Sequence, residues 1–224
     1  MTETELFALI RKRISTILSQ KQRPVRVAIN GIEGTGKTVF TRKLTTNLQT
    51  QKIKALHVSI DGFHFDKKIR YRQGKDSAKG YYEDAYDESG FVEKLLLTSQ
   101  SDHPTITKAT HDLDTDKYLH SAPIPIDKHT VILTDGAYLF KSTFREHWDL
   151  KIYLKTSFAM ALQRGVERDR ETLGGHQLAK KKFEERYHAA SRRYLQENQP
   201  LDLADLVIDN SDCSDLKLLK NRWS

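Results

Sequence analysis

The stretch GIEGTGKT, at residues 31–38, has the residue types and spacing of a loop that binds phosphate groups. Its glycines permit the backbone angles that turn amide N–H groups inward, and the helix expected after it adds partial positive charge. Lys37 would place its ammonium on the β- and γ-phosphates, and the hydroxyl of Thr38 can hold Mg²⁺. The nucleotide-binding residues predicted here are Gly31, Ile32, Glu33, Gly34, Thr35, Gly36, Lys37, Thr38 and Val39.

Two aspartates end apolar runs that read as strands. Asp61 follows ALHVSI, and Asp135 follows TVILT. The carboxyl ends of parallel strands face the ligand crevice, so both aspartates are expected at the same edge as the loop. We predict that Asp135 binds the metal together with Thr38, and that Asp61 accepts the proton of an attacking hydroxyl. A role as a simple turn residue is the alternative for each, and Asp61 could also contact a ligand of the metal instead of acting as the base.

Two arginines are predicted to act from a helix that follows the fourth strand. LQRGVERDRETLGG places Arg164 and Arg168 four residues apart, on one face. Cations on a mobile element beside such a loop neutralise charge in phosphoryl transfer and exclude water. We expect Arg164 to bind the nucleotide, Arg168 to act in catalysis with Lys37, and a lid at about residues 168–180. A solvated basic face is the alternative.

The elements that position these residues alternate along the chain. A helix is expected after Thr2 and Glu5, which form a capping-box pattern, and others near 37–50, 157–170 and 177–198. A last short helix is expected in SDLKLLKNRW. The strands predicted from β-branched runs are VRVAIN, ALHVSI, TVILTDG, DLKIYLKT and ADLVIDN.

This alternation predicts an α/β fold with a mostly parallel sheet that is covered on both faces. The 224 residues, 38% of them apolar, suit one domain over residues 1–224. Residues 66–84 read as a long loop or a short irregular helix, and the sequence does not decide the order of residues 101–128.

Composition argues against several classes of protein. The single cysteine, Cys213, excludes an intrachain disulfide and fits a reducing cytosol, so we expect a cytoplasmic protein. No apolar run approaches the length of a membrane span.

The net charge of +7 is spread along the chain, and nucleic acid is not expected as a main ligand. The nine histidines show no metal-binding spacing, and only His64, beside Asp61, stands out.

Six motifs together resemble the uridine kinase family, within the wider group of uridine kinases, pantothenate kinases and phosphoribulokinases. In the family's order, over about residues 25–210, they are GIEGTGKT, SIDGFH, YDESGF, ILTDGAYLF, RGVERD and ADLVIDN. This ordered set is much more specific than the glycine loop alone. DGFH looks closer to the Asp-Gly-Phe of pantothenate kinases and to bacterial uridine kinase-like proteins.

The resemblance implies a P-loop NTPase three-layer sandwich with a five-stranded parallel sheet and a helical, arginine-bearing lid. It also implies ATP with Mg²⁺ and transfer of the γ-phosphoryl to a primary hydroxyl; a preference for GTP and the oligomeric state, a homodimer included, stay open. Asp61 matches the family's catalytic base and Asp135 the acid that assists the metal. Lys37 and Thr38 match the phosphate and Mg²⁺ residues, and Arg164 and Arg168 match the lid arginines.

The sequence departs from uridine kinases in two places, the lid and the segment that recognises the acceptor. Gly174-Gly175 stands where their lid continues with Gly-Arg, and His111 and Asp116 stand near the Tyr and His that embrace uracil. A nucleoside is the first expectation for the acceptor, and pantothenate or a sugar is the alternative. We expect residues 62–90 and 105–120 to line its pocket, with polar contacts from His64, Arg72, Tyr82, Asp84 and His111.

Two other classes of function compete with a small-molecule kinase. DESG matches the D-x-x-G of GTPases, which suggests a regulatory ATPase or switch, but it does not end a strand and no N-K-x-D motif exists. The positive charge suggests a nucleic-acid-binding ATPase, but the chain has no basic stripe interleaved with aromatic residues.

Overall fold

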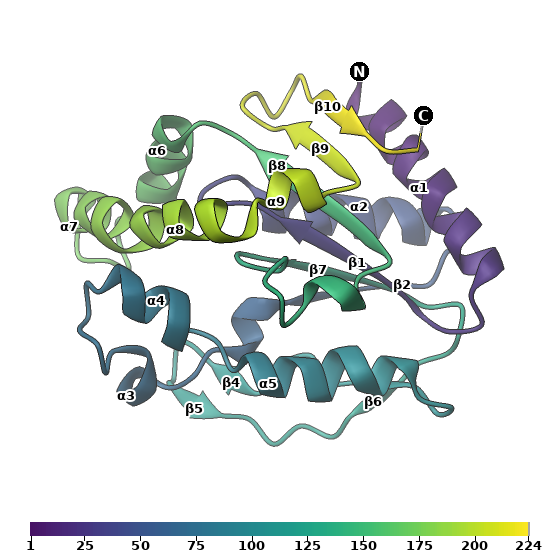
Figure 1. Cartoon of the computed structure of the whole chain (residues 1–224), viewed down its shortest axis with the longest axis horizontal. Helices are drawn as coiled ribbons and strands as arrows, with labels where there is room; N and C mark the ends of the chain where they lie inside the picture. Colours follow the sequence, from purple (N-terminus) through teal and green to yellow (C-terminus); the bar gives the residue numbers. More distant parts are fainter. Residues whose placement is uncertain (224) are drawn as a thin grey trace.

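A computed structural model describes residues 1–223 as a central sheet between two layers of helices (Figure 1). The sheet has six strands in the order β10-β9-β8-β1-β7-β2. Its strands are β1 (Val25–Asn30), β2 (Ala55–Ser59), β7 (Val131–Gly136), β8 (Leu150–Lys155), β9 (Leu206–Asp209) and β10 (Lys217–Asn221). The first five pair in parallel, which confirms the predicted α/β class and its five parallel strands.

The sixth strand corrects the sequence analysis, which predicted a five-stranded sheet and placed a short helix in the C-terminal tail. β10 instead pairs antiparallel with β9 at the edge of the sheet, with a register shift between Leu218 and Lys220. The tail is too short for a helix that is stable by itself. Pairing satisfies the edge of β9, and the side chains of Leu216 and Leu218 join the core beneath.

Two apolar cores explain why the parallel strands are buried on both faces. One core joins the sheet to α1 (Glu3–Gln20) and α2 (Lys37–Thr50). The other joins it to α5 (Glu88–Phe91) and α8 (His188–Asn198), together with α4 (Ala78–Asp84) and α9 (Pro200–Leu203). Figure 1 shows the layers, with α1 and α2 on one side of the sheet and α5 and α8 on the other. All residues of β1 and β7 are buried, as expected for central parallel strands.

Local signals set most helix boundaries. The predicted capping box is present, because Thr2 accepts from the Glu5 amide and Glu5 accepts from the Thr2 amide. Ser157 caps α6 (Phe158–Asp169), and Asp87 caps α5. Gly175 precedes α7 (His176–Lys182), which a π-helical segment, Phe183–Tyr187, joins to α8 as one long helix.

The segments of undecided structure form small elements beside the sheet. Residues 66–84 contain two short helices, α3 (Lys67–Arg70) and α4 (Ala78–Asp84). Residues 101–128 contain two pairs of two-residue strands: β3 (Thr105–Ile106) with β6 (Ile124–Pro125), and β4 (His111–Asp112) with β5 (Lys117–Tyr118). The last helix is α9 (Pro200–Leu203).

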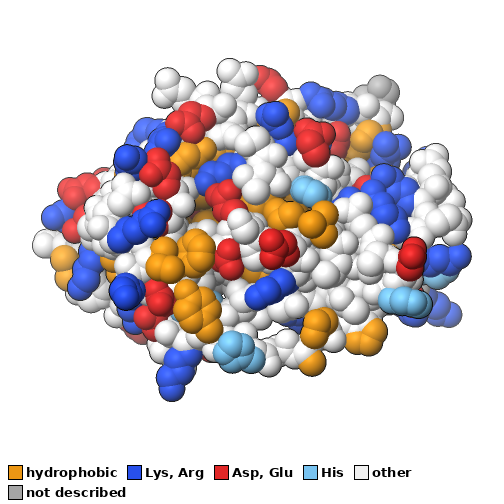
Figure 2. Space-filling model, turned by 60° about the horizontal axis from the view of Figure 1, so that its bottom comes forward, with side chains coloured by type: hydrophobic (Ala, Val, Ile, Leu, Met, Phe, Trp, Pro, Cys, Tyr) orange, Lys and Arg blue, Asp and Glu red, His pale blue; other side chains and the backbone are white. Residues whose placement is uncertain are grey.

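The face of the protein shown in Figure 2 carries charged side chains of both signs. On the face shown in Figure 2, Lys and Arg side chains alternate with Asp and Glu and do not merge into a continuous basic surface. Over residues 1–223, no helix has the length and apolar character needed to cross a membrane.

Candidate active site

The phosphate-binding loop joins β1 to α2, and its glycines hold backbone conformations that other residues rarely adopt. Gly34 and Gly36 have φ values of 89° and 86°. A Cβ on Gly34 would lie 2.1 Å from the carbonyl oxygen of Ala161, so the loop packs directly against the backbone of α6. The loop then opens onto the N-terminus of α2, where free amide N–H groups and partial positive charge suit phosphate.

Lys37, the first residue of α2, is held inside the loop. Its Nζ donates a hydrogen bond of 2.8 Å to the carbonyl oxygen of Ile32. Burial lowers the pKa of Lys37, and the carboxylates of Glu33, Asp135 and Asp61 oppose that shift. Three carboxylates therefore stabilise the partly buried ammonium, and an additional anion there would stabilise its charge further.

Thr38 and Asp135 meet as the sequence predicts. The Thr38 hydroxyl donates to Oδ2 of Asp135 over 2.6 Å, and Oδ1 of Asp135 lies 2.5 Å from Nε2 of His57. Burial favours the neutral acid, but the hydrogen bonds from His57 and Thr38 outweigh it and lower the pKa of Asp135. Asp135 is therefore ionised at neutral pH.

This pair fits Mg²⁺ in the chemistry of its donor atoms. A hydroxyl and a carboxylate offer the oxygen ligands that Mg²⁺ prefers, and Mg²⁺ in nucleotide sites keeps waters and phosphate oxygens as its other ligands. Within residues 1–223 no group of three or more His, Cys, Asp and Glu side chains could hold a metal alone. Thr38 and Asp135 suit a metal that arrives with a nucleotide.

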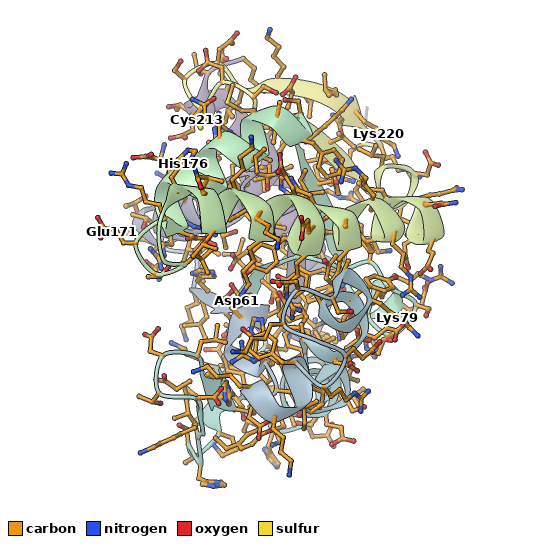
Figure 3. All side chains as sticks on the ribbon, turned by 90° about the vertical axis from the view of Figure 1, so that its left-hand side faces the viewer. Asp61, Lys79, Glu171, His176, Cys213 and Lys220 are labelled. Atoms are coloured by element: carbon orange, nitrogen blue, oxygen red, sulfur yellow. The ribbon has the colours of Figure 1, made fainter. Side chains whose placement is uncertain are left out.

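Asp61 lies just beyond β2, in a 3₁₀ turn, Ile60–Phe63, and its side chain is exposed. The Tyr86 hydroxyl donates to Oδ1 of Asp61 over 3.2 Å, and Nδ1 of His64 contacts the Asp61 carbonyl oxygen at 2.8 Å. Figure 3 shows Asp61 between the long helix formed by α7 and α8 and the segment that holds α3 and α4. The carboxylate is held by one tyrosine and stays open to a ligand.

A cavity of about 250 Å³ brings the two aspartates together with the loop. Its walls come from the phosphate-binding loop, the ends of β2 and β7, the segment 64–86 and the long α7–α8 helix. The residues that line it include Glu33, Lys37, Thr38, Asp61, His64, Arg70, Tyr71, Tyr81, Tyr86, Leu113, Asp135, Arg168, Phe183, Arg186 and Tyr187. Asp135, Lys37 and Asp61 therefore line one cavity.

A second cavity of about 480 Å³ lies on the other side of the loop. Gly34, Gly36, Lys37, Thr38 and Val39 line it, together with both predicted arginines, Asn210 and Cys213. The Arg164 guanidinium donates to the carbonyl oxygens of Asn210 and Ser211, each over 2.7 Å. Predicted nucleotide-binding residues therefore surround a cavity that Asp61 does not line, although Gly34, Lys37, Thr38 and Arg168 line both cavities.

Arg168 is shared by the two cavities, since it lines both. Its guanidinium forms two hydrogen bonds with Asp169, of 2.6 and 2.8 Å, and these raise its pKa. A cation between a nucleotide cavity and an aspartate stands where charge develops as a phosphoryl group moves.

The structure separates most of the predicted acceptor-binding residues from the cavity. Of the five, only His64 lines it; burial lowers the pKa of His64 and favours a neutral ring. Arg72 and Asp84 pair with each other at its outer side, and Tyr82 faces Asn198 and Lys141. The His111 side chain is buried, 3.4 Å from Asp116, which also binds Arg70.

The residues that line the cavity instead were missed by the sequence analysis. Tyr86 belongs to YDESGF and Tyr81 to the pair YY, of which the sequence analysis predicts Tyr82 as the binding residue. Helix α4 turns Tyr81 toward Tyr86 and Tyr187, at ring-centroid distances of 6.4 and 4.8 Å. A helical period over residues 78–84 would have indicated that adjacent tyrosines face different ways.

Two buried arginines line the same cavity. Arg70 pairs with Asp116, and its Nε has no hydrogen-bond partner among the described residues. Arg186 donates to the carbonyl oxygens of Gly74, Lys75 and Ser77 and stacks on Tyr71 and Tyr81. Arg186 therefore fastens the segment 70–77 to the long helix.

The same helix is tied to the phosphate-binding loop. Nε2 of His188 donates to the carbonyl oxygen of Glu33 over 3.0 Å, and the Ser191 hydroxyl donates to the Glu33 carboxylate over 2.5 Å. The long helix thus contacts the loop through Glu33 and the segment 70–77 through Arg186.

Comparison with known proteins points to one family. The sequence profile of the phosphoribulokinase / uridine kinase family matches residues 26–217. The uridine kinase of Leuconostoc citreum is 26% identical over 153 residues, which cover 68% of this chain and 71% of that protein.

Solved structures share the fold at low sequence identity. A possible uridine kinase from Bacillus stearothermophilus aligns with a TM-score of 0.65 and 21% identity, over 88% of this chain and 98% of that one. A D-glycerate 3-kinase from Cryptococcus neoformans aligns with a TM-score of 0.59 and 10% identity, over 96% and 99% of the two chains.

Proposed function

Because the chain belongs to the phosphoribulokinase / uridine kinase family, we propose that this P-loop kinase transfers the γ-phosphoryl of ATP, with Mg²⁺, to a hydroxyl group of a small molecule. The observation that carries the proposal is that Lys37, Asp135 and Asp61 face one cavity, while a second cavity lies across the loop. One cavity receives the acceptor and the other the nucleotide.

Each polar group has a role in this reaction. The Asp61 carboxylate, oriented by Tyr86, accepts the proton of the attacking hydroxyl. Lys37 and the loop amides hold the phosphates, and Arg168 neutralises charge on the group in transfer. Thr38 and Asp135 would hold Mg²⁺, which supplies charge neutralisation between the β- and γ-phosphates. Arg164 holds the loop after β9 at the nucleotide side.

A nucleoside is the acceptor that we propose first. Tyr71, Tyr81, Tyr86 and Tyr187 line the acceptor cavity with His64, and their ring faces suit a planar base. Relatives described as uridine kinases act on such a compound. His111 and Tyr82, which the sequence predicts as acceptor contacts, do not line the cavity. Recognition of a base would therefore use the four tyrosines that do.

A small hydroxy acid is the second acceptor, and the two arginines favour it. Arg70 and Arg186 both line the cavity, and Arg186 has no carboxylate partner among residues 1–223. A carboxylate on the acceptor would form a charge-assisted ion pair with these guanidinium groups. A fold neighbour described as a D-glycerate 3-kinase acts on a hydroxy acid.

The test is ADP release by the purified protein with Mg²⁺ and ATP, over a panel of nucleosides, pantothenate, sugars and hydroxy acids. The proposal expects one class to accelerate ADP release and to yield a phosphorylated product by mass spectrometry. ATP hydrolysis that no hydroxyl compound accelerates would favour a regulatory ATPase and reject the kinase reaction.

The variant Asp61→Asn examines the proposed base. We expect kcat to fall by about 10²- to 10⁴-fold, because a general base contributes that much, while the affinity for ATP is kept. Asp102→Asn, at an exposed turn far from the cavity, is the matched control. Transfer that survives in Asp61→Asn would show that Asp61 is not the base.

A further inference from the structure

His57 lies on the sheet face that α2 covers, beside the metal-binding pair. It occupies the middle of β2, where side chains alternate between the two faces. Ala55 joins the core beneath α1 and α2, whereas Val58 joins the opposite core, so His57 shares the face of Ala55. The register aligns His57 with Leu133 and Ser59 with Asp135 in β7, so His57 is a diagonal neighbour of Asp135.

The His57 ring and the Thr38 hydroxyl hold the two oxygens of one carboxylate. Nε2 of His57 lies 2.5 Å from Oδ1 of Asp135, and Oγ1 of Thr38 lies 2.6 Å from Oδ2. Asp135 is almost entirely buried, and a carboxylate oxygen in such a contact accepts the hydrogen of a ring N–H. Nε2 of His57 therefore carries the hydrogen and donates it.

These contacts restrict rotation of the carboxylate in two ways. Thr38 holds one oxygen from α2, and His57 holds the other from β2, an edge strand. Each oxygen keeps a second lone pair for a metal ion or a water bound to it. Without His57, Thr38 alone would orient the group, and the carboxylate could turn away from the phosphate-binding loop.

We propose that His57 is a positioning residue for Mg²⁺: it fixes the orientation of Asp135 so that Asp135 and Thr38 together meet the metal that accompanies the nucleotide. The proposal rests on the proposed function only in assigning the metal to Asp135 and Thr38. Replacing a residue that hydrogen-bonds to a metal ligand typically lowers metal affinity or activity by about 10- to 100-fold. A loss of that size is expected for His57.

The test uses Mn²⁺ as the probe and ADP as the nucleotide, with free Mn²⁺ measured by electron paramagnetic resonance. His57→Leu, which keeps bulk but removes the donor, should weaken Mn²⁺ binding to the ADP complex by at least about tenfold. His57→Gln, which can still donate, should stay close to wild type, and His57→Asn, which is too short to reach, should resemble His57→Leu. ADP affinity measured in EDTA should not change in any variant.

Controls separate positioning from packing. His120→Ala, at an exposed site, should leave Mn²⁺ affinity unchanged. Thermal melting reports the folding of every variant, and the comparison of Gln with Asn holds even if His57→Leu does not fold. In kinetics, His57→Leu should raise the KM for Mg²⁺, and saturating Mg²⁺ should restore kcat.

The outcomes distinguish this proposal from the kinase assignment. Unchanged Mn²⁺ affinity in both His57→Leu and His57→Asn would overturn the role of His57, even in an active kinase. Mn²⁺ binding that depends on His57, in a protein that phosphorylates no acceptor, would support the role of His57 and reject the kinase reaction. A wild-type ADP complex that binds no Mn²⁺ would overturn both.

Discussion

Gly34 is the position where the structure predicts the sharpest effect of adding one methyl group. A Cβ there would lie 2.1 Å from the carbonyl oxygen of Ala161, whereas close C···O contacts in proteins are about 3.3 Å. In Gly34→Ala the phosphate-binding loop and α6 must therefore separate by about 1 Å. A left-handed conformation at a residue with a Cβ adds about 1–2 kcal/mol of strain.

The displacement should affect nucleotide binding and catalysis more than stability. A misplacement of about 1 Å near a reacting group can cost about 100-fold in rate, and the loop carries both Lys37 and the amides that hold phosphate. We expect Gly34→Ala to lose at least about 100-fold in kcat/KM for ATP. Calorimetric titration with ADP and the ADP-release assay measure the loss.

Gly74→Ala separates the clash from the strain. Gly74 also has a positive φ, of 103°, but the nearest atom to its added Cβ would be 3.9 Å away. This variant should lose about 1–2 kcal/mol of stability in urea denaturation and keep its affinity for ADP. Nearly wild-type ADP affinity in Gly34→Ala would refute the proposed contact between the loop and α6.

Three further predictions concern stability and the acceptor side. Asp149 is buried among cations including Arg26, so Asp149→Asn should cost about 3–5 kcal/mol in urea denaturation; a loss below 1 kcal/mol would contradict this. Burial lowers the pKa of His64 and His188 below 6.5, so near that pH the unfolded chain binds more protons than the folded chain. The free energy of unfolding should therefore fall as the pH drops through 6.5. His64→Gln should reduce this dependence of the free energy of unfolding on pH. Arg186→Met frees the segment 70–77, so the acceptor KM should rise at least about tenfold while the KM for ATP changes little; equal effects on both would refute it.

The sheet and the phosphate side were predictable because they follow from local patterns. β-branched runs become strands, and parallel strands bring Asp61 and Asp135 to the same edge as the loop. The contact between Thr38 and Asp135 follows from that edge together with the first turn of α2. None of these features requires knowledge of the irregular segments.

The acceptor side was not predictable because it is built from those segments. Tyr81 and Tyr82 are adjacent, and only the start of α4 at Ala78 decides which one meets the cavity. Tyr187 and Arg186 arrive from a helix about 100 residues later, and the sequence contains no spacing that relates them to Asp61. His57 and Ser59 share one face of β2, as the period of a strand predicts, but the partner of His57 lies in another strand.

The contacts made by the long helix have a consequence for how the affinities of the two ligands depend on each other. Glu33 holds His188 and Ser191, and the same helix fastens the segment 70–77 through Arg186. A nucleotide that shifts the loop therefore also biases the walls around the acceptor. Thermodynamic linkage requires the reverse: if bound nucleotide raises acceptor affinity by some factor, bound acceptor raises nucleotide affinity by the same factor.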